Sequence, residues 1–236
     1  MTFTAIIPLR AGSKRIPWKN TRLLNWKPLF TYTLDNALKS KKINNIIITT
    51  DDLKVIEILN NDYKKELDLW ILIILKRDEK LSSDKSTTVD VILDVIEKNN
   101  FIENIVLLQA TSPFRNTKNI DWAIKLFKEN DFNSVISIHK TKEFPYWQHK
   151  INSKWFLEPL MWLEFYNTRS QDLPKTYMEN WAILISSKNS FIENNGFYTD
   201  FTKAFVLNEI EAIDIDEEID FEYCEFLLTK NKIWAL

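Results

Sequence analysis

Short, continuous apolar runs alternate along the first 140 residues with segments whose apolar side chains recur at helical spacing. A continuous run predicts a strand buried on both faces, whereas recurrence every three to four residues predicts an amphipathic helix. The predicted strands are Phe3–Pro8, Ile46–Thr50, Leu69–Leu75, Ile105–Gln109 and Ser134–His139. The predicted helices are Leu29–Leu38, one that begins at about Asp52, and others at about Thr88–Glu97 and Ile120–Lys128.

This alternation predicts one α/β domain over all 236 residues, Rossmann-like, with a mainly parallel sheet and helices on both faces. The alternation of strands and helices ends after His139, and residues from about 140 to 180 are rich in aromatic side chains and turn formers. We expect that stretch to be an insertion that forms a dimer surface or a substrate lid. Trp181–Ser186 and Ala204–Leu207 are predicted as returning strands, and a last helix is expected from about Glu217 to Leu228.

The charge balance argues against two classes of partner. Lys and Arg total 31 against 33 for Asp and Glu, so no positive excess is available for a nucleic-acid backbone or an anionic membrane surface. The longest apolar run, Leu69–Leu75, is far shorter than the ~20 residues that span a bilayer, and the N-terminus lacks a signal-peptide pattern. We therefore expect a cytoplasmic protein that binds neither nucleic acid nor membrane.

Soft metal ligands are scarce in this chain. Cys224 is the only cysteine, and His139 and His149 are the only histidines. They form no cluster at zinc-ligand spacing, and a lone cysteine has no internal disulfide partner. We interpret all three as structural residues and expect any bound metal to take hard oxygen ligands.

The loop that follows the first predicted strand is a candidate phosphate site, because ligands of an open parallel sheet bind beyond the carboxyl ends of its strands. Between Leu9 and Asn20 the loop contains four cations, a glycine and a hydroxyl. Backbone N–H groups and cations in such a loop can hold a triphosphate. The spacing matches neither the P-loop nor the dinucleotide-binding fingerprint, and a solvated basic loop is the alternative.

Asp214 and Asp216 alternate with Ile213 and Ile215 near the end of the chain. In an extended segment the two carboxylates share one face while the isoleucines enter the core. Two carboxylates on one face predict a magnesium site. The alternative is a strand end followed by a helix cap.

Six blocks spread over nearly the whole chain carry a more specific signal. They are Ile6–Pro17 with Lys19-Asn20, Lys76-Arg77, Ser82-Ser83-Asp84 with Ser86-Thr87-Thr88, Leu107–Arg115, Asn167–Pro174 and Ile213–Asp216. Together they resemble the acylneuraminate cytidylyltransferases, that is, the CMP-sialic acid synthetases and their pseudaminic and legionaminic acid relatives.

The resemblance implies a Mg²⁺-dependent homodimer that transfers CMP from CTP to the anomeric hydroxyl of an acidic nine-carbon sugar, a nonulosonic acid, and releases pyrophosphate. It assigns to the nucleotide Arg10, Ser13, Lys14, Lys19, Asn20, Arg77, Ser86, Thr87, Thr88 and Gln109. It assigns to the sugar Gln109, Arg169 and Gln171, and to the metal Asp214 and Asp216. The catalytic residues that it implies are Arg10, Lys19, Asp214 and Asp216. Thr87 also suits a helix N-cap, and both roles are compatible.

Two other functions stay open. Tyr146 and Trp147 follow Pro145 where some family members carry a lysine, which leaves the identity of the sugar undecided. A cytidylyltransferase for the eight-carbon acid KDO is therefore one alternative. The other is a relative that binds the nucleotide without catalysis, against which the intact catalytic residues argue.

The composition contains one anomaly, nine tryptophans against two glycines, whereas average usage is about 7% glycine. Trp18, Trp26 and Trp181 stand where the family resemblance leads us to expect glycine. Asn25-Trp26, for example, replaces Asn-Gly, a favoured turn because glycine accepts positive φ. Drift in an AT-rich genome would deplete glycine without favouring tryptophan. The other hypothesis is that UGA codons meaning glycine in the source organism were translated as tryptophan.

Overall fold

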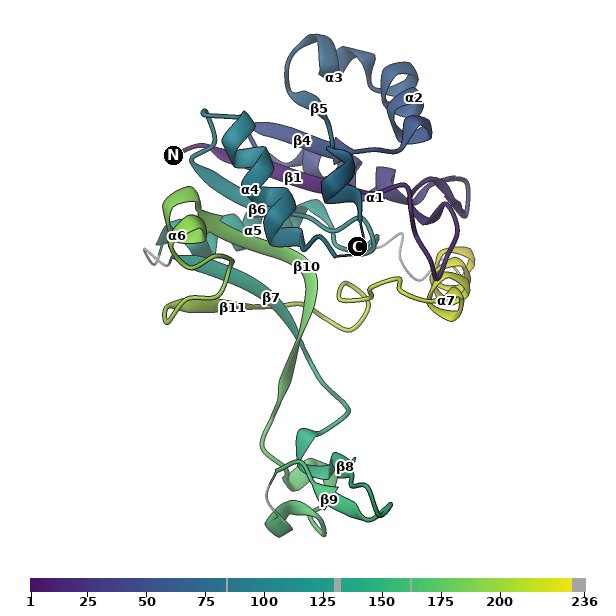
Figure 1. Cartoon of the computed structure of the whole chain (residues 1–236), viewed down its shortest axis with the longest axis vertical. Coiled ribbons are helices and arrows are strands. Elements are labelled where there is room, and N and C mark those ends of the chain that lie inside the picture. Colours follow the sequence, from purple (N-terminus) through teal and green to yellow (C-terminus); the bar gives the residue numbers. More distant parts are fainter. Residues whose placement is uncertain (84, 130–132, 162, 231–236) are drawn as a thin grey trace.

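The centre of the molecule is a seven-stranded sheet with the strand order β11-β7-β10-β6-β1-β4-β5. The computed structural model describes residues 1–236 except 84, 130–132, 162 and 231–236. The strands are β1 (Phe3–Leu9), β4 (Asn45–Thr50), β5 (Leu72–Lys76), β6 (Asn104–Leu107), β7 (Ser134–Lys140), β10 (Tyr177–Ser187) and β11 (Thr202–Val206). Only β10 runs antiparallel to its neighbours in this sheet, so the predicted mainly parallel sheet is confirmed (Figure 1).

Helices cover both faces of the sheet, as the sequence predicts. One face carries α1 (Leu29–Lys39), α2 (Leu53–Asp62) and α5 (Thr117–Glu129), and the other carries α4 (Thr88–Lys98) and α6 (Lys188–Glu193). In β1, Phe3, Ala5, Ile7 and Leu9 pack with the first group of helices, whereas Ile6 packs with the second. Successive side chains of a strand point to opposite faces, so this apolar strand needs cover on both.

A third apolar cluster anchors the end of the chain beside the loop after β1. Helix α7 (Glu218–Thr229) contributes Phe221 and Cys224, which pack with Ile16 of the loop and with Ile215. This cluster fixes the segment before α7 against the first loop, so two distant parts of the sequence meet. Within the described residues, no helix is both long enough and apolar enough to cross a bilayer.

Two predicted strands begin in the wrong place. Strand β10 begins at Tyr177, before the predicted Trp181. The sequence pattern predicts a strand over Leu69–Leu75, but β5 begins only at Leu72. A short helix, α3 (Lys64–Asp68), precedes it, and Trp70 reverses the chain with a φ of 57°. The other segments that the pattern did not predict are α6, β2 (Leu23–Leu24), β3 (Lys27–Pro28), β8 (His149–Ile151), β9 (Leu157–Pro159) and the 3-10 turns η1 (Lys19–Thr21), η2 (Glu79–Ser82), η3 (Pro145–Trp147), η4 (Leu163–Phe165) and η5 (Ser170–Asp172).

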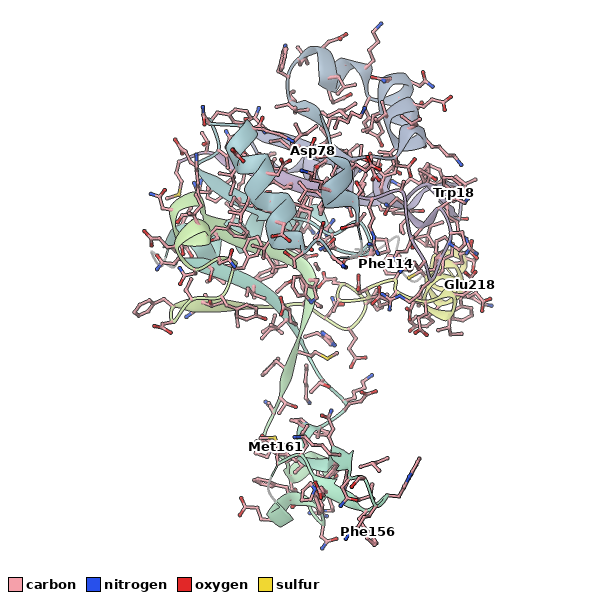
Figure 2. The ribbon with its side chains drawn as sticks, viewed as in Figure 1. Trp18, Asp78, Phe114, Phe156, Met161 and Glu218 are labelled. Carbon is pink, nitrogen blue, oxygen red and sulfur yellow. The ribbon has the colours of Figure 1, made fainter. Side chains whose placement is uncertain are left out.

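The segment between β7 and β10 leaves the sheet as an arm, which Figure 1 shows below the body of the molecule. It contains the β8–β9 hairpin and the turns η3 to η5. Figure 2 shows Phe156 at the far end of the arm. This is the segment for which the sequence predicts an insertion, and its role as a dimer surface or lid stays a prediction.

Candidate active site

A cavity of about 630 Å³ lies beyond the carboxyl ends of the central strands. It brings together all ten residues that the resemblance assigns to the nucleotide and both aspartates assigned to the metal. They come from the loops after β1, β5 and β6, from the start of α4 and from the segment before α7. The further lining residues are Pro8, Arg15, Leu81, Ser83, Val91, Thr111 and Trp181.

The loop after β1 is held in place by hydrogen bonds to its backbone. The N–H of Ala11 donates to Oδ1 of Asp51 at 2.9 Å, and the amide nitrogen of buried Asn20 donates to the carbonyl of Arg10 at 3.0 Å. Asn20 therefore stabilises the loop as well as lining the cavity. Sequence reasoning missed Asp51, although it is the first residue after a predicted strand, where ligands of such sheets are expected.

Lys19 lies among oxygen atoms at the edge of the cavity. Its Nζ donates to the carbonyl of Ile215 at 2.8 Å and lies 3.6 Å from Oδ1 of Asp216, which Arg15 contacts at 3.0 Å. Burial lowers the pKa of Lys19, and the carboxylates of Asp216 and Asp214 oppose that change. Asp216 thus partly neutralises the basic loop, and an anionic ligand would compete with it for Lys19 and Arg15.

Asp214 and Asp216 both line the cavity, while Ile215 between them is fully buried, as the alternation predicts. The N–H of Ile215 donates to the carbonyl of Thr111 at 2.8 Å, which fixes the pair beside the loop after β6. Among the described residues, Oδ1 of Asp214 is buried without a hydrogen-bond partner. Burial raises the pKa of this carboxyl, the Thr111 side chain lowers it, and Asp216 adds to the rise. An unpaired buried carboxylate oxygen is costly and suits a bound cation.

The start of α4 places backbone N–H groups at the cavity. Thr87 is its N-cap, and its Oγ1 accepts from the N–H of Asp90 at 3.1 Å while Asp90 Oδ2 accepts from the N–H of Thr87 at 2.8 Å. This reciprocal pair is a capping box. Thr87 also lines the cavity, so the capping role is confirmed and is compatible with a ligand contact.

Two buried arginines hold the walls of the cavity in place: Arg77 lines the cavity, and Arg115 is not among the lining residues. Arg77 donates from NH2 to the carbonyl of Thr49 at 2.9 Å, and burial lowers its pKa. Arg115 is fully buried and donates from NH1 to the carbonyls of Gln109 at 3.1 Å and Ala182 at 2.8 Å, and burial lowers its pKa to about 9. Arg115 therefore ties the Gln109 loop to β10. It was not predicted as a site residue, although it ends the Leu107–Arg115 block.

Arg169 and Gln171, which are assigned to the sugar, are not among the residues that line this cavity. Both lie in the arm at η5, and Nε of exposed Arg169 contacts Oδ2 of Asp172 at 2.8 Å. Their contact with the sugar stays a prediction. Asp84, which belongs to one of the six blocks, lies outside the described residues.

None of the three residues interpreted as structural lines the cavity. Cys224 is fully buried and His149 packs against the ring of Tyr166. His139, on β7, is not among the residues that line the cavity. In the described part of the chain, no group of three or more His, Cys, Asp or Glu residues is arranged to hold a metal ion. A cation at Asp214 and Asp216 would therefore need ligands from a bound substrate or water.

Several known proteins are similar to this chain over nearly its whole length. The chain is 35% identical over 240 residues to the CMP-N,N'-diacetyllegionaminic acid synthase of Legionella pneumophila, covering 98% of each chain. It is 28% identical to the pseudaminic acid cytidylyltransferase of Campylobacter jejuni, covering 96% of each. It is 30% identical to the N-acylneuraminate cytidylyltransferase of Streptococcus agalactiae, and that alignment covers 92% of this chain but only 51% of the Streptococcus protein.

Solved structures and family models agree as well. The structure of CMP:2-keto-3-deoxy-manno-octonic acid synthetase complexed with CTP superposes with a TM-score of 0.70 at 12% identity, over 98% of this chain and 99% of the other, which shows a shared fold. The model of the cytidylyltransferase family matches residues 4–153, the part that carries the basic loop and the start of α4. The chain belongs to the cytidylyltransferase family.

Proposed function

We propose that the chain is a magnesium-dependent enzyme that transfers CMP from CTP to the anomeric hydroxyl of a nonulosonic acid and releases pyrophosphate. The observation that carries this proposal is one cavity that brings together five basic side chains, the N-terminus of α4 and two aspartates. A triphosphate favours the first two features and a magnesium ion the third. We place the reaction in the cytoplasm, where CTP is available.

The triphosphate is expected along the loop after β1. Arg10, Lys14, Arg15 and Lys19 all line the cavity there, and charge-assisted hydrogen bonds to phosphate oxygens are among the strongest in proteins. The positive end of α4 adds backbone N–H donors. These groups stabilise the charge that builds on the leaving pyrophosphate. Loss of one such contact typically costs on the order of a hundredfold in rate.

The cytosine is expected at the part of the cavity lined by Gln109, Ser86 and Thr88. Amide and hydroxyl groups supply both donors and acceptors, which the pyrimidine edge requires. The tie between Arg115 and the Gln109 carbonyl holds this wall in position.

Asp214 and Asp216 fit a magnesium ion. Mg²⁺ is usually held by one or two carboxylates together with substrate phosphates and waters, so two aspartates suffice. The buried, unpartnered Oδ1 of Asp214 supports this assignment. When bound, the ion would polarise the α-phosphate and lower the pKa of the acceptor hydroxyl.

The proposed transfer is an in-line displacement at the α-phosphorus of CTP. The anomeric oxygen of the sugar forms a bond to that phosphorus while the bond to the pyrophosphate oxygen breaks, and the hydroxyl releases its proton to solvent water. The protein contributes chiefly position and charge. The hydrogen bond from Asn20 to the Arg10 carbonyl fixes the loop that aligns the phosphates.

The acceptor sugar is inferred from the relatives of the chain. The names of the three curated relatives described above all refer to nonulosonic acids, which favours a nine-carbon sugar over KDO. The KDO-activating structure shares 12% identity and supports only the fold. A catalytically inactive relative is disfavoured because Arg10, Lys19, Asp214 and Asp216 all line one cavity.

We infer a homodimer formed through the arm. Large apolar side chains are exposed along it at Ile151, Phe156 and Leu157, and such patches mark interaction sites. Arg169 and Gln171 belong to the same arm and do not line the cavity of their own chain. If they contact the sugar in this arrangement of the arm, they do so in the cavity of the second copy.

Pyrophosphate release tests the proposed reaction. The full chain is mixed with CTP, Mg²⁺ and one acid at a time: a legionaminic, a sialic, a pseudaminic acid or KDO. We expect release that needs both Mg²⁺ and at least one nine-carbon acid. Release with KDO alone would favour the eight-carbon alternative. CTP binding without release in any mixture would favour the inactive relative.

A further inference from the structure

We propose that glycine is the native residue at Trp18, Trp70, Trp155 and Trp181, encoded by UGA codons that the source organism reads as glycine. Of the nine tryptophans, Trp162 and Trp234 lie outside the described residues, which leaves seven. Four of these seven have φ values between 56° and 63°. In this left-handed region a Cβ crowds the following carbonyl oxygen, so glycine is the usual occupant. The only other non-glycine residues with positive φ in the described chain are Asn25 and Asn195, of the type that tolerates it best.

Trp70 occupies the glycine position of a helix C-terminus. The N–H of Trp70 donates to the carbonyl of Leu67 at 3.0 Å, and the N–H of Ile71 donates to the carbonyl of Glu66 at 3.0 Å. These two bonds define the Schellman motif, in which the residue after the C-cap is left-handed and is usually glycine. The motif ends α3 and turns the chain into β5.

Trp18 occupies the glycine position of a proline-containing turn in the basic loop. The N–H of Lys19 donates to the carbonyl of Ile16 at 3.2 Å, which places Pro17 second and Trp18 third in the turn. A turn with proline second and a positive φ at the third position is of type II, and glycine is strongly preferred there. Trp18 is 62% exposed, and Figure 2 shows it at the outer edge of the body.

Trp155 closes the β8–β9 hairpin of the arm. Its N–H donates to the carbonyl of Asn152 at 2.9 Å, and the N–H of Asn152 donates to the carbonyl of Phe156 at 3.1 Å. This is a three-residue hairpin loop whose last residue is left-handed, a position that glycine commonly fills. Trp155 is 84% exposed, so no packing of the indole explains its presence.

Trp181 lies in an irregular stretch of β10. Glu179 faces Ile138 of β7 and Leu184 faces Ile136, so residues 180–183 face Ser137 alone. Trp181, the second of these four residues, is left-handed with a φ of 56°, a conformation that glycine adopts most readily. Its indole is 42% exposed and lines the active-site cavity.

Two other tryptophans provide a contrast. Trp147 packs edge-on against Phe144, with ring centroids 5.4 Å apart, and its Nε1 donates to the carbonyl of Phe165 at 3.2 Å. Trp122 lies inside helix α5. Neither has a positive φ, and neither does Trp26, so the prediction of glycine at position 26 rests on the sequence resemblance alone.

The substitution matters for the active site. Trp181 lines both the main cavity and a neighbouring one of about 250 Å³, and the two cavities also share Thr87 and Thr88. Glycine at position 181 would remove the indole between these spaces and join them. The enzyme of the source organism would then have a more open substrate site than the chain with tryptophan.

The gene and the native protein give the direct test. We expect UGA at the codons for Trp18, Trp70, Trp155 and Trp181, and UGG at those for Trp122 and Trp147. Peptides of the protein isolated from the source organism should have the mass of glycine at the first four positions. A UGG codon, or a peptide with tryptophan, at any of the four would overturn the proposal.

Stability gives a second test that does not depend on the proposed function. Alanine and glycine both remove the indole. The difference between W70G and W70A, and between W155G and W155A, therefore measures only how well each residue tolerates the left-handed backbone. We expect each glycine variant to melt about 2–4 °C above its alanine counterpart. The matched pair W122G and W122A should show the opposite order, because glycine destabilises a helix interior. Equal or lower melting temperatures for W70G and W155G would overturn the backbone argument, whatever CTP binding shows.

Discussion

Asp214 should limit the stability of the free protein while being required for activity. We predict that Asp214→Asn raises the melting temperature of the ligand-free chain and lowers turnover at least about a hundredfold. The reason lies in its surroundings. Oδ1 is buried without a partner in the described structure, so this oxygen loses hydration that no protein donor replaces.

The size of the stabilisation follows from opposing contributions. An unpaired buried polar group costs about 1–3 kcal/mol. The nearby Lys19 and the hydrogen bond from Thr111 offset part of the cost of the charge. Asparagine keeps the shape but still lacks a partner at one atom, so a net gain of about 1 kcal/mol is expected. For a chain of this size that corresponds to roughly 2–4 °C in melting temperature.

The stabilisation of Asp214→Asn relative to the wild type should increase with pH. Burial raises the pKa of Asp214 in the folded state above its ordinary value near 3.8. The folded protein therefore binds this proton more tightly than the unfolded chain, and stability is lost as the pH rises from 3.8 through the raised pKa. The advantage of Asp214→Asn should be complete above that window and should vanish below it.

Thermal unfolding in EDTA at several pH values measures this difference, with Asp200→Asn, an exposed aspartate outside the cavity, as the matched control. Pyrophosphate release measures turnover. Added CTP and Mg²⁺ should stabilise the wild type more than Asp214→Asn, because the variant has lost a proposed ligand to the metal. An Asp214→Asn protein that is less stable than the wild type at neutral pH and turns over normally would refute the reasoning.

Three further predictions test other parts of the site. Asp216→Asn should also lower turnover at least about a hundredfold, but with little change in melting temperature, because its ion pairs with Arg15 and Lys19 are partly exposed; wild-type rates would remove Asp216 from the metal site. Arg169→Ala should raise the sugar KM or lower kcat with little change in CTP affinity; an equal loss of CTP binding would place Arg169 at the wrong ligand. The Cys224 thiol, whose pKa burial raises to about 12, should react with thiol reagents only after unfolding; rapid labelling of the native protein would contradict its buried position.

The parts of the fold that could be predicted are those set by local pattern. Phe3–Leu9 is apolar throughout because both faces of β1 are covered, and such a run is visible in the sequence. Asp214 and Asp216 could be paired from their alternation with buried Ile215. Contacts such as Ala11 with Asp51 join residues 40 positions apart, and no local pattern specifies which partner a loop will find.

The position of the two residues assigned to the sugar could not be predicted, for a different reason. Arg169 and Gln171 were identified by resemblance, which names residues without giving their positions. The arm carries them away from the cavity of their own chain, and no hydrophobic period encodes the direction in which an insertion projects. Whether they act in a second copy depends on an interface that a single sequence does not specify.

Two of the failures of pattern reading share one cause. The strand over Leu69–Leu75 was started too early, and the β8–β9 hairpin was not predicted. Each error falls at a left-handed tryptophan, Trp70 in the first case and Trp155 in the second. With glycine at these positions, the same rules would end a helix before residue 70 and close a hairpin loop at residue 155. The backbone thus follows the turn signals of a sequence with glycine there, which is the result expected if tryptophan replaced glycine during translation of the gene.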